Sequence, residues 1–435
     1  MLGPLSNPTF RHLFAAQVVA LVGTGLATVA LGLLAWQLAG ADAGAVLGTA
    51  LAIKMVAYVT LAPIAAALAE RVPRRAFLVL LDVIRAVVIA CLPFVDQVWQ
   101  VYLLIFLLQA ASAGFTPAFQ AVIPDVLKYD GDYIKALSLL RLAEDLEQIA
   151  SPILAAALLT VVGFPVLFAG TVAGFLGSAL LVATARLPAR EAAGHGQFWS
   201  DVTKGIWIYT RTPRLRGLMA MEAAVAAAGA MVYVNTVVLV QDRLGLGETS
   251  VALAFAAFGA GSMLAAVLLP RILSWLGDRP VMIGGAGLMV ACVAGVPVAG
   301  TFSGLLALWA VIGFGFSLTQ TPIGRIMNRS ARAEDRGAVF AAQFALSHAC
   351  WLVTYPLAGW IGAEAGMIAA ALSLAAIGGV GLVAVLLLWP ALDPEVLGHR
   401  HPDLPPDHPH LLAHGVEHSH PLMIDDLHRT WPRPS

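Results

Sequence analysis

The sequence predicts an all-α membrane protein of about twelve transmembrane helices. Composition is the first observation: 59% of the 435 residues are hydrophobic and only 12% are charged, whereas soluble domains carry roughly 25% charged residues. The second is that apolar runs such as 21–39 and 368–389 are long enough to cross the ~30 Å hydrocarbon core of a bilayer. These runs fill most of the chain and leave no room for a soluble domain with its own core.

Apolar runs between polar breaks predict twelve spans of about 20 to 25 residues each. A long break after the sixth span divides the chain into an N-terminal six-helix half (1–186), a cytoplasmic linker (187–216), a C-terminal six-helix half (217–392) and a tail (393–435). The predicted spans are 13–38, 44–69, 76–95, 99–123, 134–160, 164–186, 217–241, 249–274, 281–300, 303–327, 337–361 and 366–389.

Lys and Arg are distributed unequally between the predicted loops. Nearly all fall on alternate loops of one side, and the loops of the other side carry Arg243 alone. Because basic loops stay in the cytoplasm, we expect both termini there, in a multi-pass protein of the bacterial inner membrane. The first apolar run, 13–38, is too long for the core of a secretory signal and is expected to stay as the first span.

Several classes of function find no support in the sequence. The net charge is −1 without a basic patch, so no nucleic-acid partner is expected. Cys91, Cys292 and Cys350 lie far apart in apolar runs and indicate neither disulfides nor a thiolate metal site. No phosphate-binding loop or nucleophile motif indicates an enzyme. The expected partners are the lipid bilayer and a transported solute, with no resident cofactor and a monomer as the expected state.

The fifth predicted span, 134–160, carries charges within its apolar sequence. At helical spacing Arg141, Glu144 and Asp145 share one stripe, with Glu147 at its edge. Each charge would cost roughly 2.5–3.5 kcal/mol at the centre of a lipid-facing helix, so these side chains must face protein or water. Two roles remain open: a transport path in which a carboxylate exchanges a proton for a cation, or an ion-pair network that pins helices together.

Six further polar residues fall inside predicted spans: Gln17, Lys54, Glu222, Asn235, Gln320 and His348. Intramembrane ionisable groups are candidates for a transport or proton path. For His348 the alternatives are a metal ligand, a proton relay or a packing residue. Lys54 is expected to neutralise part of the acidic surplus on span five. Glu222 is expected near a helix end, where its side chain can reach the membrane surface.

The two halves show signs of an internal duplication. An offset of 205 residues relates one set of residues in the first half to a matching set in the second. Such repeats are common in transporters. The sets are Thr116–Pro117, Asp130 and Ala136, and Thr321–Pro322, Asp335 and Ala341.

The segment from Ala66 to Arg75 resembles the G-x-x-x-D-R-x-x-R-R signature of the major facilitator superfamily, with Ala for Gly and Glu for Asp. The resemblance implies the major facilitator fold and a cluster of charges that locks the cytoplasmic helix ends in one conformation. The residues expected in that cluster are Glu70, Arg71, Arg74, Arg75, Asp82 and Arg85.

A second resemblance is to the fourth-helix signature of the drug and siderophore exporters of that superfamily, carried by Phe115, Pro117, Gln120, Ala121, Pro124, Asp125 and Ala136. It implies that span five lines the central cavity, and that spans two and eleven, with Lys54 and His348, pack together. The chain departs from the pattern where Gln109 stands for an arginine and Ser151-Pro152 for a Gly-Pro pair. Ordinary drug–proton exchange is therefore not what the sequence predicts.

The tail contains eight of the eleven histidines and is rich in Pro and Asp, so we expect it to be disordered. Because residues i and i+2 of an extended chain point the same way, each of three His-x-His pairs can close on one metal ion. The alternative is a solvated tail without a role. The candidate ligands are His399, His401, His408, His410, His414, His418, His420 and His428.

A twelve-span exporter with a histidine tail resembles the nickel-resistance efflux proteins of the superfamily, the NreB type. The resemblance implies efflux of a divalent transition metal, nickel first and cobalt second, in exchange for protons. One alternative is an exporter of organic compounds or siderophores, favoured by a mostly apolar cavity. The other is a non-transporting membrane sensor that binds metal through its tail, which would require a signalling domain.

Overall fold

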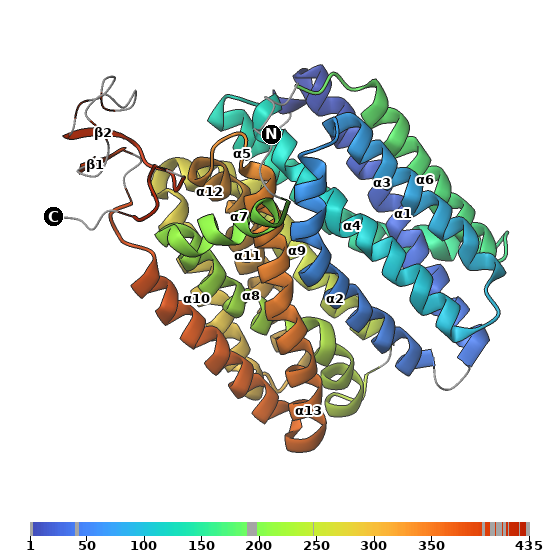
Figure 1. Cartoon of the computed structure of the whole chain (residues 1–435). Coiled ribbons are helices and arrows are strands. Elements are labelled where there is room, and N and C mark those ends of the chain that lie inside the picture. Colours follow the sequence, from blue (N-terminus) through green and yellow to red (C-terminus); the bar gives the residue numbers. More distant parts are fainter. Residues whose placement is uncertain are drawn as a thin grey trace.

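The computed structural model describes residues 3–39, 43–188, 198–246, 248–393, 396–400, 405, 411, 415, 417–425 and 427–431. Figure 1 shows two groups of long helices lying side by side, one from each half of the chain. The first group comprises α1 (Pro8–Ala39), α2 (Ala43–Ala69), α3 (Arg74–Cys91), α4 (Val98–Val126), α5 (Asp130–Leu159) and α6 (Pro165–Thr184), with 3-10 turns at Gly3–Ser6 and Leu92–Phe94.

The second group begins after a shorter helix, α7 (Phe198–Arg211), which lies within the predicted linker. Its helices are α8 (Pro213–Val238), α9 (Glu248–Leu276), α10 (Asp278–Gly295), α11 (Phe302–Gln320), α12 (Ile323–Ser330) and α13 (Arg336–Leu388), with a π-helical turn at Leu239–Arg243 and a 3-10 turn at Val296–Val298. α13 contains two spans, because Gly366 at φ 85° breaks its helical backbone, a conformation that glycine adopts at no steric cost.

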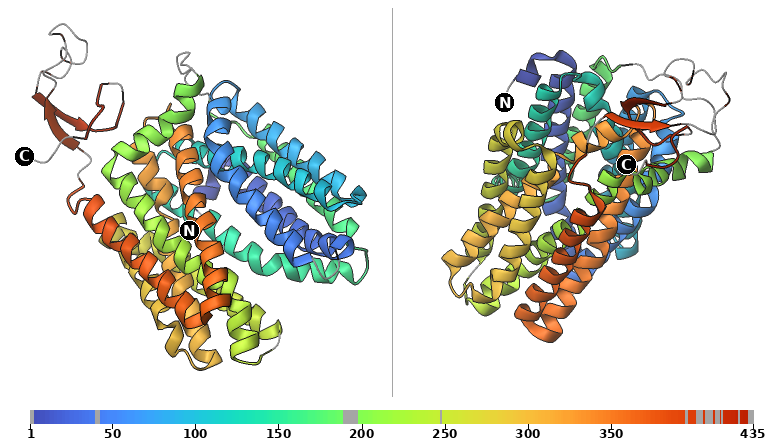
Figure 2. Two further views of the ribbon diagram at one scale, coloured as in Figure 1. Left: turned by 60° about the horizontal axis from the view of Figure 1, so that its bottom comes forward. Right: turned by 90° about the vertical axis from the view of Figure 1, so that its left-hand side faces the viewer.

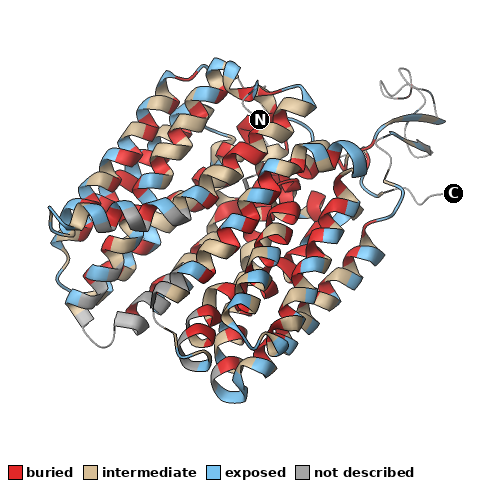
Figure 3. Ribbon diagram, turned by 180° about the vertical axis from the view of Figure 1, so that it is seen from behind, coloured by how far each residue is buried: buried red, intermediate tan, exposed pale blue. Residues whose placement is uncertain are grey.

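Eleven stretches of the described helices are long and apolar enough to cross a membrane. The missing twelfth is α5, whose 30 residues would suffice in length but whose charges exceed what a lipid-facing span tolerates. The prediction of about twelve transmembrane helices in two six-helix halves is confirmed. Figure 3 shows that buried residues lie where helices face one another, and α8 is the most enclosed of the candidate spans.

The two halves repeat one arrangement. The starts of α1, α3, α4 and α5 differ from those of α8, α10, α11 and α13 by 204 to 206 residues. Between the halves, the second span of each packs against the fifth span of the other: α2 against α13 and α5 against α9. The two halves differ at one equivalent position. Pro117 lies inside the continuous helix α4, whereas the helix breaks at the matching Pro322, between α11 and α12. This arrangement fits the duplication that the sequence indicates.

Small side chains bring the halves into contact. Ala62 and Ala66 of α2 form one buried cluster with Ala341 and Ala345 of α13, and such residues let helix backbones approach closely within a membrane. The halves meet at the end of the molecule that carries the start of α1 and the tail, which we call the terminal face. From there they diverge towards the opposite face (Figures 1 and 2).

The tail contains regular structure where the sequence predicts none. Strands β1 (Val396–Arg400) and β2 (Glu417–Pro421) pair antiparallel, with His399 opposite His418, and lie beside the terminal face (Figure 2). Beyond β2, Ile424 is buried in the core of the second half. The backbone pairing and this apolar anchor offset the disorder that the polar composition favours. Residues 401–404, 406–410 and 412–414 lie outside the described part.

Candidate functional site

A cavity of about 250 Å³ lies between the two halves and is lined by residues of both; we call it the central cavity. Its wall is mixed: amide, charged and imidazole groups stand next to phenylalanine rings. Of the residues predicted for the transport path, it contains Arg141, Glu144 and His348. The complete lining is Gln17, Thr116, Phe119, Gln120, Ile123, Leu137, Leu140, Arg141, Glu144, Gln320, Thr321, Ile323, Gly324, Met327, Phe340, Gln343, Phe344, Ser347 and His348.

The charges on α5 form one branched ion pair, the α5 triad of Arg141, Glu144 and Asp145. Arg141 Nη2 lies 2.6 Å from Asp145 Oδ1, and Arg141 Nη1 lies 3.2 Å from Glu144 Oε2. The i+3 and i+4 spacings place both carboxylates within reach of one guanidinium. Asp145 is 2% exposed, whereas the Glu144 side chain is 38% exposed. Glu144 is thus the carboxylate of the triad that a solute in the cavity can reach.

The α5 triad also connects the two halves. Ser262 of α9 donates a hydrogen bond to Asp145 Oδ2 at 2.6 Å and accepts one from Arg141 Nε at 3.4 Å. The Arg141 guanidinium lies 4.8 Å from the centre of the Phe316 ring of α11. Both roles left open by the sequence therefore have geometric support: the triad pins α5 to the second half and presents one carboxylate to the cavity.

Glu147 lies apart from the central cavity, on the side of α5 that faces α1. Its carboxylate accepts a hydrogen bond from Ser151 and is attracted by Lys54. The approach of α1 is close because Gly25 has no side chain: a Cβ there would lie 2.5 Å from Glu147 Oε1. Neither Glu147 nor Lys54 lines the central cavity. At this point of the helix the side chain turns away from Asp145 and the inter-half surface, since residue 147 lies about 60° around the axis from residue 144 but about 160° from residue 145.

His348 faces the central cavity from α13. Its Nδ1 lies 2.7 Å from the Phe344 carbonyl oxygen; a carbonyl can only accept, so Nδ1 carries the proton and Nε2 keeps a lone pair. The His348 ring meets the edge of Tyr58 of α2, with centroids 4.7 Å apart, and Lys54 Nζ lies 5.5 Å from the Tyr58 ring. α2 and α13 thus pack together around these residues, as expected.

Glu222 lies deeper than the sequence indicates. It is 2% exposed and lies in the third turn of α8, so its side chain does not reach the membrane surface. Gln343 Nε2 donates to its Oε1 at 2.8 Å, and Gln320 Nε2 lies 3.2 and 3.3 Å from its two oxygens. The Tyr209 hydroxyl of α7 donates to Gln343 Oε1. Both glutamines line the central cavity, so Glu222 sits immediately behind its wall.

Asn235 is a packing residue and not part of the cavity wall. Its amide nitrogen lies 3.2 Å from the Ala358 carbonyl oxygen and 3.5 Å from Met231 Sδ. The side chain is 1% exposed. It ties α8 to α13, because a buried amide must find a hydrogen-bond partner.

The predicted charge cluster divides into two parts. Arg74 lies 2.6 Å from Asp125 at the end of α4, and Arg336 at the start of α13 pairs with the same carboxylate. Asp125 therefore joins the halves at the terminal face. Asp82 and Arg85 instead form a buried pair inside the first half, where Ser178 of α6 also contacts Asp82. These two side chains therefore face α6 and α4 within the first half and do not lie at this contact between the halves. Arg75 is exposed, and Glu70 and Arg71 lie in the turn before α3.

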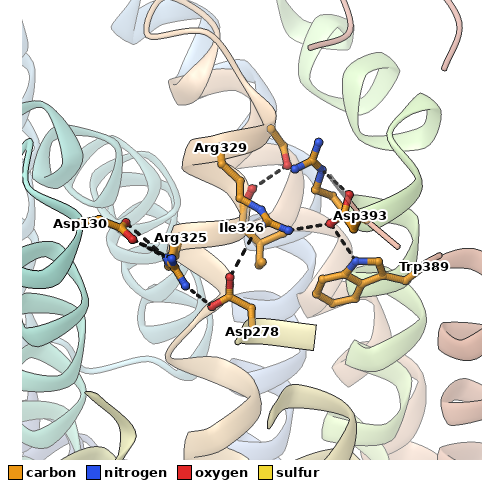
Figure 4. A network of polar contacts seen from close by, with 9 residues as sticks. Asp130, Asp278, Arg325, Ile326, Arg329, Trp389 and Asp393 are labelled. Atoms are coloured by element: carbon orange, nitrogen blue, oxygen red, sulfur yellow. Dashed lines mark hydrogen bonds and ion pairs between the residues drawn. The ribbon is translucent and has the colours of Figure 1, made fainter. Parts of the chain in front are cut away.

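A second set of ion pairs joins the halves through α12 (Figure 4). Arg325 lies 2.7 Å from Asp130 of α5 and 2.8 Å from Asp278 of α10. Arg329, one turn later, lies 2.6 Å from Asp393 just after α13. These residues were missed from the sequence because a positive-inside bias explains loop arginines without any partner. One feature of the sequence could have indicated them: Asp130 belongs to the set of residues that recurs 205 positions later, and this acidic residue needs a basic partner.

Three predicted metal ligands of the tail are described with their side chains. The His418 and His420 rings stack at 5.1 Å and the His420 and His428 rings lie 5.0 Å apart. His428 Nδ1 lies 2.9 Å from Asp425 Oδ1. In the described part of the chain, no group of three or more His, Cys, Asp or Glu side chains is arranged to hold a metal ion. His399 lies in β1, while His401, His408, His410 and His414 lie outside the described residues.

The end of the tail is docked on the second half through Asp425. Arg332 pairs with its carboxylate, which also accepts a hydrogen bond from the His428 backbone amide. Although burial acts to raise the pKa of the Asp425 carboxyl, this amide and the Arg332 guanidinium outweigh it and hold the pKa below its ordinary value. Burial lowers the pKa of the His428 imidazole, against the attraction of Asp425.

The sequence matches the Major Facilitator Superfamily over residues 13–348 and again over 218–419. The chain belongs to the major facilitator superfamily. No curated protein matches it. Among solved structures, the human organic anion transporter MFSD10 (TETRAN) superposes with a TM-score of 0.75 at 13% identity, covering 87% of this chain and 99% of that one.

Two further solved structures are similar. A bacterial homologue of the iron transporter ferroportin, in an outward-facing state, gives a TM-score of 0.70 at 14% identity over 87% of this chain and 97% of that one. The Escherichia coli fucose:proton symporter FucP gives 0.70 at 14% identity over 88% and 98%. At these identities the likeness shows the fold. The chain is a multi-pass membrane transporter.

Proposed function

We propose that this transporter exports a divalent transition metal, nickel first and cobalt second, in exchange for protons. The observation that carries the proposal is the pair of ligand groups at the central cavity: the lone pair of His348 Nε2 and the exposed carboxylate of Glu144. Imidazole and carboxylate together suit borderline divalent metals. The cavity also lies between the halves, where transporters built from repeats bind their substrates.

The tail supports the same proposal from outside the membrane. His-x-His pairs in a strand place both rings on one side, as the stacked His418 and His420 show. Metal held there raises the local metal concentration beside the terminal face. The tail cannot itself form the transport path, which the spans must provide.

In this proposal the terminal face is cytoplasmic, the membrane is the bacterial inner membrane and the working unit is a monomer. The one-sided distribution of Lys and Arg supports the orientation. Reporter fusions at the end of the tail should report the cytoplasm, and a fusion at Asp96 should report the outside. Termini on opposite sides of the membrane would overturn it.

A second candidate, export of an organic compound or siderophore, has an observation in its favour. Phe119, Phe340, Phe344 and Met327 make part of the cavity wall apolar. Such a surface suits an amphiphile whose charged group meets the α5 triad. One similar structure is the organic anion transporter MFSD10, but the same fold also occurs in the ferroportin homologue, so the fold does not choose between them.

Metal flux decides between the candidates. Purified protein in liposomes is assayed for uptake of Ni²⁺, Co²⁺ and Zn²⁺ under an imposed pH gradient. We expect Ni²⁺ uptake that Glu144→Gln and His348→Ala both abolish and that Glu364→Gln, at the opposite face, leaves intact. Absence of metal flux from the wild-type protein, with flux of an organic cation or anion, would overturn the metal proposal. Metal binding by the tail without any flux would favour the sensor.

A further inference from the structure

Glu222 differs from every other carboxylate in the spans described above in having amide partners instead of a cation. Its hydrogen-bond donors in the described part of the chain are Gln320 and Gln343, and no Lys, Arg or His side chain there pairs with it. An ionised carboxylate buried without a cation is costly by several kcal/mol. A neutral carboxylic acid avoids most of this cost.

We propose that Glu222 is the group that takes up and releases the exchanged proton, and that Gln343 and Tyr209 are the switch that accommodates both of its protonation states. The proposal rests on the proposed exchange of metal for protons. It assigns the proton to α8 in the second half and leaves the metal to the cavity residues Glu144 and His348.

Two hydrogen-bond patterns fit the same side chains. With Glu222 ionised, both glutamine amides donate to it and the Tyr209 hydroxyl donates to Gln343 Oε1, as observed. When Glu222 gains a proton, its new O–H needs an acceptor. Rotation of the Gln343 amide by half a turn supplies its oxygen to Glu222 and its N–H to Tyr209, whose hydroxyl accepts as well as it donates. The amide has nearly the same shape in both orientations, so the Glu222 carboxyl and the Gln343 amide keep hydrogen-bond partners in both states.

The network has a short route to the central cavity. Gln320 and Gln343 belong both to the Glu222 network and to the cavity wall. Rotation of these side chains, without backbone movement, exposes the carboxyl to water in the cavity. The four residues come from α7, α8, α11 and α13, so a change at Glu222 acts on helices of the second half that also carry the cavity ligand His348.

The other titratable groups near Glu222 do not take over this role. The hydroxyl of Tyr209 from α7 and the thiol of Cys350 from α13 feel its charge. α10 and α12 also pack against α8 and carry Asp278, Arg325 and Arg329, but these pair with one another and with Asp130 and Asp393. α9 packs against α8 as well, and its Ser262 bonds to the α5 triad.

The α5 triad is unsuited to proton exchange in this state. Asp145 is neutralised by Arg141 at 2.6 Å, and protonating Asp145 would leave the guanidinium with the more exposed Glu144 alone. Removal of one partner's charge from a buried pair costs about 3–5 kcal/mol. A single buried carboxylate with amide partners changes its protonation state without breaking such a pair.

The test compares transport modes of Glu222→Gln in liposomes with Ni²⁺ as the probe. Ni²⁺ accumulation driven by a pH gradient should fall about 100-fold, the contribution typical of a positioned proton-transfer group. Exchange of Ni²⁺ for Ni²⁺ at equal pH, which moves no net proton, should stay at the wild-type rate. Tyr209→Phe should shift the pH profile of accumulation while leaving exchange intact. Glu364→Gln, which removes a carboxylate at the opposite face, is the matched control.

A readout without metal separates this proposal from the proposed function. The infrared carbonyl band of protonated carboxylic acids is followed in the full-length protein from pH 6 upwards, where exposed carboxyls are already ionised. In that range it should lose one titrating group in Glu222→Gln and none in Glu364→Gln. An unchanged titration in Glu222→Gln would overturn the assignment, whatever the substrate. Loss of both accumulation and exchange in a folded Glu222→Gln protein would also overturn it, because Glu222 would then be needed for every mode. Absence of Ni²⁺ transport in the wild type with the titration intact would instead overturn the metal proposal alone.

Discussion

The two halves of this transporter each bury a carboxylate beside the central cavity, but they treat its charge differently. In the first half, Asp145 lies 2.6 Å from the Arg141 guanidinium and accepts a hydrogen bond from Ser262 across the interface. In the second half, Glu222 is held by Gln320 and Gln343 and by no cation among the described residues. A carboxylate paired with arginine is fixed in its charged form, whereas one paired with amides is free to change charge. The difference indicates that Asp145 stabilises the structure, whereas Glu222 serves proton coupling.

The largest effect is expected from removing the cation. Arg141→Ala leaves Asp145 buried without its partner, at a cost of about 3–5 kcal/mol, and should lower the unfolding temperature and abolish transport. Thermal unfolding of the purified protein measures the first effect. Adding Asp145→Asn to Arg141→Ala should recover much of the lost stability, since no unpaired charge then remains. Equal unfolding temperatures for the single and double variants would show that the pair is not what stabilises α5. Glu222→Gln, by contrast, should unfold near the wild-type temperature.

The next prediction distinguishes the two carboxylates of the α5 triad, Glu144 and Asp145. Glu144→Gln removes the exposed carboxylate and leaves the Arg141–Asp145 pair intact, so folding should be normal. If Glu144 binds the transported ion, Ni²⁺ uptake should be lost at the concentrations that the wild type transports, because the apparent affinity falls by at least about 10- to 100-fold. Asp145→Asn should also lose efflux, with a lower unfolding temperature than Glu144→Gln. Wild-type rates in both variants across pH would mean that the triad is purely structural.

The described part of the tail contacts neither Asp145 nor Glu222, so removing the tail tests a region outside both halves. Truncation after Pro394 removes its histidines, so export should weaken mainly at low metal concentration, by the loss of locally concentrated ion. The maximal rate should stay near normal. Metal uptake measured against concentration in inverted vesicles separates the two quantities. The double substitution His418→Ala and His420→Ala, which keeps the rest of the tail, is the control for lost docking. No flux at saturating metal after truncation would place the tail within the mechanism.

The smallest expected effect concerns how the tail end stays docked. His428 has its pKa lowered from 6.5, so docking favours the neutral ring and should weaken as pH falls below about 6.5. Asp425 has its pKa lowered from 3.8, so its contribution is present above that value and is lost only at still lower pH. Spin labels introduced at positions 211 and 429, adjacent in the structure, should lie at one short distance at pH 8 and at longer distances at pH 5.5. In His428→Asn the distance should no longer change between these two pH values. A change of the same size in His428→Asn would exclude His428 as its cause.

Sequence patterns predicted the fold and one side of the candidate site. The charged stripe on α5 and the contact of α2 with α13 around His348 follow from helical periodicity and from the resemblance to the superfamily. Glu222 was placed wrongly near the membrane surface, because its position along α8 says nothing about the glutamines that α11 and α13 bring to it. The contacts of Asp82 and Arg85 within the first half could not be predicted for the same reason: their charge was visible, but the partner Ser178 is 96 residues from Asp82.

By itself the sequence determined that this protein crosses a membrane about twelve times in two related halves, because span length and apolar composition are local properties that the bilayer enforces. It also determined which side chains cannot face lipid. Only the tertiary structure decided which of these charges are neutralised. Arg141 finds Asp145 one turn away on its own helix, whereas the partners of Glu222 lie 98 and 121 residues further along the chain. Hydrogen bonds over such separations depend on how helices pack, and helix packing rather than local sequence gives Glu222 its two amide partners.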